Sequence, residues 1–358
     1  MRKNKISLFG VVSFVLFLLS LGMLIISRRS VGAADYLNEH ISSPFRRFMA
    51  SFGDIFPFSL FELLVILSPI LAALLIWRFV VVFRRGYGRA RLVSNVLAIA
   101  LLLYSGNALA LGISYNTTSV DEYMKLPDVT VNEEGLKDAM TELCLEVNAL
   151  SEKIEFSDGE SHSGYSLDEL SEKICESYSE ISEKYGCLAS FDSRAKGVDA
   201  LHFMSYLSLT GIYTYSTGES NVNTDYPDYD VTFTAAHELA HQRGVLRENE
   251  ANFMAYLACS TSTDAYFRYS AALNMLSYVG SALWQTNPDA YYEILSSLNT
   301  DALSDLRASS EVSRRYGDTL FSDISSFVND MFLKSNGTDG VVTYGRVVTL
   351  YMSYREVK

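Results

Sequence analysis

Three long apolar runs constrain this 358-residue chain more than any other feature of its sequence. They cover about residues 6–27, 57–83 and 92–115. Each run is long enough to cross a bilayer, and a segment in lipid has to satisfy its own backbone hydrogen bonds as a helix. The first run is too long for the apolar part of a signal peptide, and it ends without a cleavage site of small residues. We therefore expect residues 1–115 to form a membrane anchor of three transmembrane helices.

Basic residues predict how these helices are oriented. The connector between the second and third helices is short and carries four arginines, so we expect it in the cytoplasm. The N-terminus then lies in the cytoplasm as well, while residues 28–56 and 116–358 lie outside it. The segment 28–56 fits imperfectly because it carries four arginines of its own. The prediction is a multi-pass protein of the cell membrane with residues 116–358 extracytoplasmic.

Charge distinguishes residues 116–358 from the anchor. Residues 1–115 contain 12 of the 29 Lys and Arg residues and 4 of the 42 Asp and Glu residues, so the remainder has 17 basic and 38 acidic residues and a net charge of −21. A domain this acidic is not attracted to nucleic acid or anionic lipid. Its acidity suits either a solvated surface or a basic substrate. The cysteines lie in this part and include no CxxC pair, which argues against a zinc-ribbon or thioredoxin-type site. They are Cys144, Cys175, Cys187 and Cys259. Cys144, Cys175 and Cys187 are candidates for a disulfide if this part lies outside the cell, and buried free thiols are the alternative.

Helical periodicity dominates residues 116–358, so we expect a mainly α fold with a small β element. Residues 116–131 resemble a stalk, and residues 132–358 form the soluble domain. Helices are expected over about residues 133–155, 166–185, 231–243, 248–260, 264–285, 289–298, 310–334 and 341–354. Ser166 and Glu169 form a capping box at the start of the second of these. Residues 207–215 are β-branched and aromatic, which is typical of a strand, and residues 218–230 are expected to be a loop.

The pattern His237-Glu238-Leu239-Ala240-His241 carries the predicted chemistry. Two histidines four residues apart lie on one face of a helix, so both imidazoles can bind one metal ion. Glu238 lies beside them, where a carboxylate can take a proton from a water molecule that the metal has activated. Gly244 is placed to end this helix. The pattern predicts a Zn2+ site; a surface helix with two solvated histidines is the alternative.

A catalytic zinc ion needs a third protein ligand and an open position for water. Glu248 and Asn252 follow on a new helix and share one face of it, as a ligand and its supporting partner do. Glu250 points about 160° away from Glu248 on an ideal helix, so only one of the two can be the ligand. Glu250 is the alternative third ligand, and an acidic residue in a first helical turn is also favourable without any metal.

Glu248-x-x-Ala251-Asn252 resembles the glutamate helix of the gluzincin metallopeptidases. The resemblance implies a zincin-like domain in which Glu248 is the third zinc ligand and Asn252 orients a zinc-binding histidine. The six residues between His241 and Glu248 form a tighter gap than is usual in gluzincins.

A longer segment, residues 237–259, resembles a family of uncharacterised bacterial membrane proteins regarded as zinc metallopeptidases. Members of that family share N-terminal transmembrane helices ahead of this motif. Further matching segments are residues 217–223, 267–270, 333–337 and 344–345. The resemblance thus covers most of the chain.

Other residues near the motif are candidate substrate contacts. The strand at 207–215 is either an edge strand that aligns an extended substrate or structural cover for the helix. Four tyrosines are candidates to stabilise the oxyanion of a tetrahedral intermediate, although each also suits the core in a chain with 23 tyrosines. They are Tyr213, Tyr215, Tyr256 and Tyr269.

These observations predict a membrane-anchored zinc metallopeptidase with Glu238 as its general base. The alternative is a catalytically inactive membrane sensor or binding protein with a structural zinc site, which needs a fourth protein ligand. Cys259 is an open candidate for that ligand. Charged residues around the motif exclude an intramembrane protease. The expected partners are a peptide or protein substrate and the lipid bilayer, and the sequence does not identify the substrate.

Overall fold

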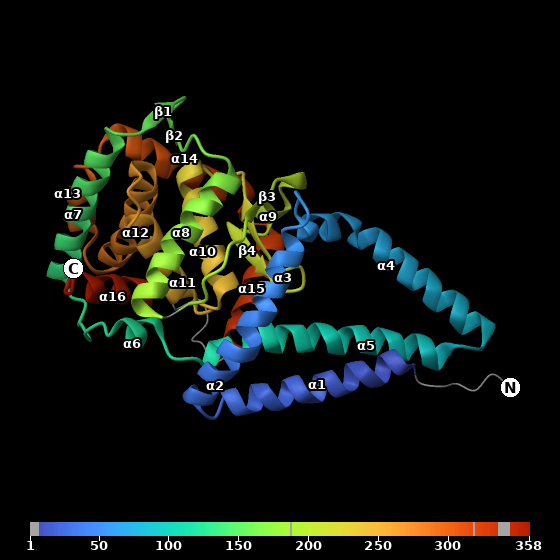
Figure 1. The fold of residues 1–358 in the computed structure, drawn as a ribbon. Coiled ribbons are helices and arrows are strands. Elements are labelled where there is room, and N and C mark those ends of the chain that lie inside the picture. The colour runs from blue at the N-terminus through green and yellow to red at the C-terminus, as the bar shows by residue number, and fades with distance from the viewer. Residues whose placement is uncertain (1–6, 187, 318, 336–343) are drawn as a thin grey trace. The chain divides into compact units, whose positions relative to one another are not determined.

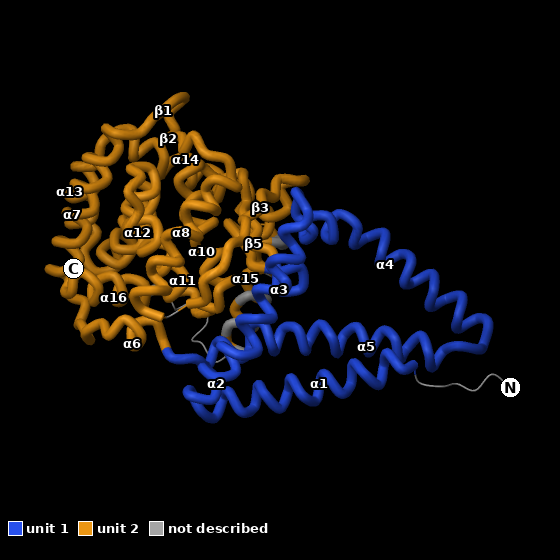
Figure 2. The backbone as a smooth tube through the Cα atoms, in the orientation of Figure 1, with its two compact units in different colours: residues 1–118, 214–218 blue, residues 119–213, 219–358 orange. Residues whose placement is uncertain are grey.

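The computed structural model describes residues 7–186, 188–317, 319–335 and 344–358, and the fold over these ranges is mainly α, as predicted (Figure 1). Contacts divide the chain into two compact units (Figure 2). Unit 1 comprises Met1–Thr118 and Thr214–Gly218, and unit 2 comprises Ser119–Tyr213 and Glu219–Lys358. Cys187 and residues 336–343 lie outside the described residues. Residues 336–343 include part of the matching segment 333–337 and the start of the helix expected at 341–354.

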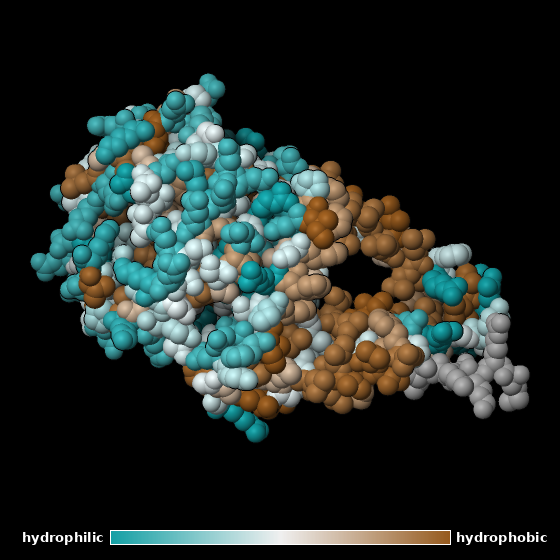
Figure 3. Space-filling view, viewed as in Figure 1, coloured by the Kyte–Doolittle hydropathy of each residue, from teal (hydrophilic) through white to brown (hydrophobic). Residues whose placement is uncertain are grey.

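Unit 1 contains the three long apolar helices. They are α1 (Leu8–Ser27), α4 (Leu60–Arg85) and α5 (Arg89–Asn107). A π-helical turn and a 3-10 turn prolong α5, so that the third apolar segment covers Arg89–Asn116. Each of the three is long and apolar enough to cross a membrane, and Figure 3 shows apolar residues over their surface. The predicted apolar helices are thus confirmed, and they support membrane association.

The segment between α1 and α4 is folded rather than an open loop. It contains α2 (Val31–Leu37), the π-helical turn η1 (Asn38–Ser42) and α3 (Ser43–Gly53). Arg46 of α3 is fully buried, and its guanidinium donates to the carbonyl of Ala110 and the hydroxyl of Ser114, both at 2.8 Å, and to Asn38 Oδ1 at 2.9 Å. This arginine therefore joins α3 to the end of the third apolar segment, which gives it a structural role.

Unit 2 contains the remaining helices. They are α6 (Val120–Met124), α7 (Glu133–Ser151), α8 (Leu167–Tyr185), α9 (Phe203–Tyr206), α10 (Asp228–Arg243), α11 (Glu248–Ser260), α12 (Ala265–Thr286), α13 (Pro288–Leu295), α14 (Thr300–Tyr316), α15 (Leu320–Ser335) and α16 (Tyr344–Arg355). The capping box of Ser166 and Glu169 is present at the start of α8. The helix expected at 310–334 is two helices, α14 and α15, and the expected stalk contains the short helix α6.

Helix α10 lies at the centre of unit 2, and 12 of its 16 residues are buried. It packs against α8, α11, α12 and strand β5. Hydroxyl groups from three of these neighbours donate to carbonyl oxygens of α10: Tyr178 to Ala236 at 2.7 Å, Ser220 to Glu238 at 3.0 Å and Ser270 to Tyr229 at 2.6 Å. The position of α10 is therefore set from several directions.

A small sheet covers one side of α10. Its strand order is β3 (Ala195–Val198), β5 (Glu219–Asn223) and β4 (Gly211–Thr214), with β3 parallel to β5. Strand β4 is shorter than the expected strand at 207–215. Strand β5 lies where a loop was expected, because its polar sequence carries no strand signal. Its polar groups are satisfied inside the fold, for example by the 2.6 Å ion pair between Glu219 and Lys196.

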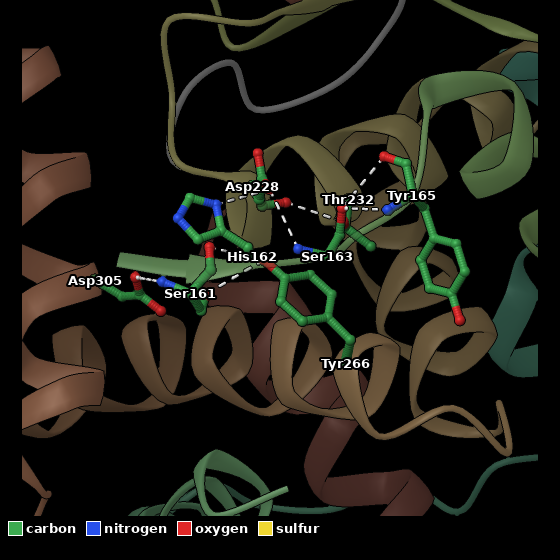
Figure 4. Close-up of polar contacts among 8 residues, drawn as sticks. All are labelled: Ser161, His162, Ser163, Tyr165, Asp228, Thr232, Tyr266 and Asp305. Atoms are coloured by element: carbon green, nitrogen blue, oxygen red, sulfur yellow. Dashed lines mark hydrogen bonds and ion pairs between the residues drawn. The ribbon is translucent and has the colours of Figure 1, made fainter. Parts of the chain in front are cut away.

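A hairpin of β1 (Glu155–Ser157) and β2 (Glu160–His162) fixes the start of α10. Figure 4 shows its polar contacts. The backbone N–H of Ser163 and the imidazole Nδ1 of His162 both face one carboxylate oxygen of Asp228, at 3.2 and 3.5 Å. The N–H of Ser161 donates to Asp305 Oδ1 at 2.9 Å. The hairpin thereby links α10 to α14.

The first prediction concerns Gly218, which ends the turn between β4 and β5. Its φ is +75°, and a Cβ there would lie 2.1 Å from the backbone carbonyl carbon of Met49. We expect Gly218→Ala to clearly lower the apparent melting temperature of the full chain in detergent, because the added methyl group clashes with the backbone of Met49. The positive φ alone costs roughly 1–2 kcal/mol. Gly164→Ala is the matched control, because Gly164 has a φ of +68° with open space around it. Equal losses in both variants would show that the contact with Met49 is unimportant.

Candidate metal centre

The two histidines of the motif lie next to each other on one face of α10. The centroids of the His237 and His241 rings are 4.5 Å apart, and the ring planes are inclined at 86°. Their side chains are only 13% and 12% exposed. The helix ends at Gly244, as predicted, where the cap N–H donates to the carbonyls of Ala240 and His241.

A short turn brings Glu248 to the histidines. Residues 244–247 connect α10 to α11, and the side chains of Val245 and Leu246 within this turn are buried. Glu248 is the first residue of α11 and points back toward α10. Its Oε2 lies 3.3 Å from Nε2 of His237, and its Oε1 lies 3.6 Å from Nε2 of His241. Across the described ranges, these three residues form the one group of His, Cys, Asp or Glu side chains that could hold a metal ion.

The distances from the two imidazoles to the Glu248 carboxylate are of the size that a shared zinc ion requires. Zinc binds histidine nitrogen and carboxylate oxygen at about 2.0–2.2 Å, so two ligand atoms on a tetrahedral zinc lie about 3.4 Å apart. The two nitrogen–oxygen distances of 3.3 and 3.6 Å lie on either side of that value. Two imidazoles and one carboxylate are also a donor set that zinc accepts, and one position is left for water.

Hydrogen bonding and charge prepare His241 and Glu248 for this arrangement. Nδ1 of His241 lies 2.8 Å from the carbonyl of Val245, which leaves Nε2 facing Glu248. Burial alone would lower the pKa of His241, but the Glu248 carboxylate raises that pKa to about 9. Burial would likewise raise the pKa of Glu248, but the charge of His241 holds it well below its usual range. A metal ion would replace the protons shared in this cluster.

Glu238 is buried between α10 and strand β4. A Cβ added to Gly211 would lie 2.4 Å from its Oε1, so the glycine makes room for the carboxylate. The backbone N–H of Tyr213 donates to this carboxylate, while Oε2 is buried without a hydrogen-bond partner. Burial raises the pKa of Glu238, although nearby His237 and His241 oppose that shift. The carboxylate is thus desolvated, close to the histidines and able to accept a proton.

Strand β4 is an edge strand beside this carboxylate. The carbonyls of Thr210 and Ile212 face β5, where they accept from the Asn223 N–H at 2.8 Å and from Asn221 Nδ2 at 3.3 Å. Because backbone groups alternate along a strand, those of Gly211 and Tyr213 face the opposite edge. The hydrogen bond from Tyr213 to Glu238 agrees with this alternation.

Several other predicted site residues lie elsewhere. Glu250 forms an ion pair with Arg247 at 2.8 Å and is absent from the histidine group. The hydroxyl of Tyr215 donates to the Leu103 carbonyl in unit 1 at 3.1 Å. Tyr256 packs edge-to-face on Tyr351 in the core of unit 2.

The remaining predicted contacts divide between core and site. The Tyr269 hydroxyl donates to Asp305 at 2.7 Å in the core. Tyr213 lies at the site through its backbone. Asn252 lies beside His237 and Glu248 in a pocket. It does not orient His237 through a hydrogen bond to Nδ1, because that atom is buried without a partner in the described structure. The three described cysteines, Cys144, Cys175 and Cys259, are buried free thiols.

A pocket of about 250 Å³ extends from the metal centre toward the start of α10. His237, Glu248 and Asn252 lie at one end, and Asp230 lies further along the same helix. Most of the other lining residues come from the segment before α10 and from α12 and α14. They include Tyr226, Asn274, Tyr278, Ser309 and Ser313. Sequence reasoning missed them, because no local pattern shows that α12 and α14 meet beside the motif.

Asp230 is a carboxylate without a cationic partner. It accepts hydrogen bonds from the side chains of Ser309, Tyr229 and Asn274. Within the described residues no lysine, arginine or histidine forms an ion pair with it. Burial raises the pKa of Asp230 from its usual 3.8 to about 6, and the nearby Asp305 adds to the rise. The pocket therefore contains one acidic group that the fold does not neutralise.

The chain belongs to a protein family described as "Protein of unknown function (DUF3810)", whose model matches residues 36–352. This match covers the segment after α1, the motif and nearly all of unit 2. No curated protein and no solved structure matches the chain.

The second prediction follows from the unneutralised Asp230. Its pKa is higher in the folded chain than the usual 3.8, so the stabilisation from its bound proton is complete below about pH 4 and is lost as the pH rises through about 6. Asp230→Asn carries no charge, so at pH 8 it should raise the free energy of unfolding by roughly 1–3 kcal/mol. The apparent melting temperature should then rise by a few degrees at pH 8 and change little at pH 4.

The full chain in detergent, scanned at both pH values, provides the measurement. Asp128→Asn, an exposed change in the loop between α6 and α7, is the matched control and should have little effect at either pH. The titratable groups facing Asp230, namely Tyr226, Tyr229 and Asp305, are the same in wild type and variants. If Asp230→Asn changed the melting temperature equally at pH 4 and pH 8, the charge of Asp230 would not be the cause of the lower stability.

Proposed function

We propose that the protein is a membrane-anchored zinc metallopeptidase. The observation that carries this proposal is the combination of a three-ligand cluster, His237, His241 and Glu248, with a buried carboxylate, Glu238, directly beside it. A purely structural cluster has no need of Glu238, whose Oε2 lacks a hydrogen-bond partner. The donor set of two imidazoles and one carboxylate supports zinc as the ion.

Each residue has a definite role in this proposal. His237, His241 and Glu248 would hold the ion, and zinc, when bound, supplies a Lewis acid and lowers the pKa of water near it. Glu238 takes a proton from the attacking water and passes it to the leaving amine of the cleaved peptide. The carbonyl of Val245 orients His241 through the 2.8 Å contact to Nδ1.

Strand β4 is suited to hold an extended peptide. Its outer edge presents the backbone of Gly211 next to Glu238, and an extended substrate can pair with such an edge as an added strand. This pairing would place the peptide bond near the carboxylate. A catalytic zinc site needs an open position, and no fourth His, Cys, Asp or Glu joins the cluster among the described residues.

The fourth-ligand candidate of a structural site, Cys259, lies eleven residues beyond Glu248. That is about 16 Å further along α11. Burial raises the pKa of its thiol to about 12, so the thiolate that a metal binds is disfavoured there. Both facts favour the catalytic site over an inactive sensor with structural zinc. We further propose that the N-terminus is cytoplasmic and that unit 2 lies outside the cytoplasm, as the four arginines between α4 and α5 predict.

The third prediction tests the metal. The purified full chain should contain about one zinc per chain by elemental analysis, and His237→Ala should lose it, because two remaining ligands hold zinc poorly. Glu248→Gln should also weaken zinc retention. Glu250→Gln is the matched control on the same helical turn; it should keep the metal, because Glu250 pairs with Arg247. Zinc-free wild type, prepared without chelators, would reject the proposed metal centre.

The fourth prediction tests the chemistry. Glu238→Gln should keep its zinc but lose hydrolysis of a pool of quenched fluorogenic peptides by about a hundredfold to ten-thousandfold, since the amide cannot act as a base. Glu293→Gln, the same change at an exposed site on α13, should leave the rate unchanged. Undiminished turnover by the Glu238 variant would remove Glu238 from the mechanism.

A further inference from the structure

The pocket beside the metal centre has a chemical character of its own. Apart from the metal cluster, the residues that line it are neutral with the exception of Asp230. Aromatic rings of Tyr226, Phe233 and Tyr278 contribute apolar and π surface. Such a lining suits an aliphatic stem that ends in a positive charge, because aromatic faces attract cations and the carboxylate pairs with them.

Two buried carboxylates of unit 2 have a cationic partner, whereas a third, Asp305, accepts hydrogen bonds in the core and does not line the pocket. Glu219 pairs with Lys196 at 2.6 Å, and Glu250 pairs with Arg247 at 2.8 Å. Asp230 receives only hydroxyl and amide donors from the fold. Asp230 is partly exposed and lines the pocket, so a cation from outside the chain can reach this carboxylate and pair with it. The net charge of −21 over residues 116–358 also attracts cations toward this unit.

We propose that Asp230 selects a positively charged group of the peptide substrate, which binds in this pocket while the peptide lies at the metal centre. This inference rests on the proposed peptidase function and adds the substrate class. Asp230 is a specificity-determining residue here, separate from the residues that hold zinc or move the proton.

Geometry limits where the positive charge can be. Asp230 precedes His237 by seven residues, so the two lie about 10 Å apart along α10. A hydrogen bond takes up about 3 Å of this span. The remainder matches a lysine or arginine side chain on a residue next to the cleaved bond. It also matches a free amino terminus about two residues away, since an extended residue spans about 3.3 Å. Both sources offer the same cationic chemistry, and the experiment separates them.

The test measures binding, with no turnover. The full chain in detergent, loaded with zinc and carrying Glu238→Gln, is titrated into fluorescent eight-residue peptides with both ends blocked, and Kd is read from anisotropy. One set moves a single lysine, norleucine or glutamate through each position. A second set compares free with acetylated amino termini. We expect a cation at one position, or at the amino terminus, to tighten binding about tenfold or more over its neutral counterpart.

Variants of the pocket decide the assignment. Asp230→Asn added to the same background should remove the cation preference and leave the Kd of the neutral peptides nearly unchanged. Asp301→Asn, with the same loss of charge outside the pocket, should keep the preference. A preference that survives Asp230→Asn, the absence of any preference for a cation, or no binding of any peptide would each overturn the proposal.

The outcomes also separate this inference from the peptidase function. Cation-selective binding that depends on Asp230, with no cleavage of the same peptides by wild type, would support the pocket and reject the peptidase. Cleavage by wild type without any charge preference would support the peptidase and reject the role of Asp230.

Discussion

The burial of α10 is the constraint on which the candidate site depends. A helix in solution frays and bends, whereas this one has neighbours around most of its surface and hydroxyl donors on its carbonyls. Tyr178, Ser220 and Ser270 come from a helix, a strand and another helix, and each adds a hydrogen bond to a carbonyl of α10. Two candidate ligands on one helix keep their spacing only if that helix is rigid. The packing of unit 2 therefore serves the geometry of His237 and His241 directly.

The turn after α10 explains how so short a spacing brings Glu248, the proposed third ligand, to the two histidines. Gluzincins usually place more residues between the second histidine and the glutamate. Here the turn is anchored by the buried side chains of Val245 and Leu246, and α11 begins at Glu248 itself. The carbonyl of Val245 also accepts from His241. This one short turn thus positions the Glu248 carboxylate and also orients the imidazole of His241.

Local patterns in the sequence predicted what local forces determine. The apolar helices, the capping box at Ser166 and both ends of α11 depend on residues close in the chain, and they were predicted well. Strand β5 was missed because its polar side chains are stable there only through partners such as Lys196, far away in sequence. The relation of His237 to His241 is set by one helix and was predictable. The pocket at Asp230 depends on α12 and α14 packing against α10, and no spacing in the sequence encodes that contact.

Two carboxylates on α10 are held in ways that cost stability, and their positions indicate why. Glu238 and Asp230 are eight residues apart, about 12 Å along the helix. Burial raises the pKa of each, and the fold gives Asp230 no ion pair within the described residues. Elsewhere in unit 2 the same fold neutralises Glu219 with a lysine, so it can supply a cation where one is useful. In the function proposed above, the two carboxylates have separate tasks along one peptide. In that proposal Glu238 moves a proton at the metal centre, and Asp230 holds a positive charge two helical turns away.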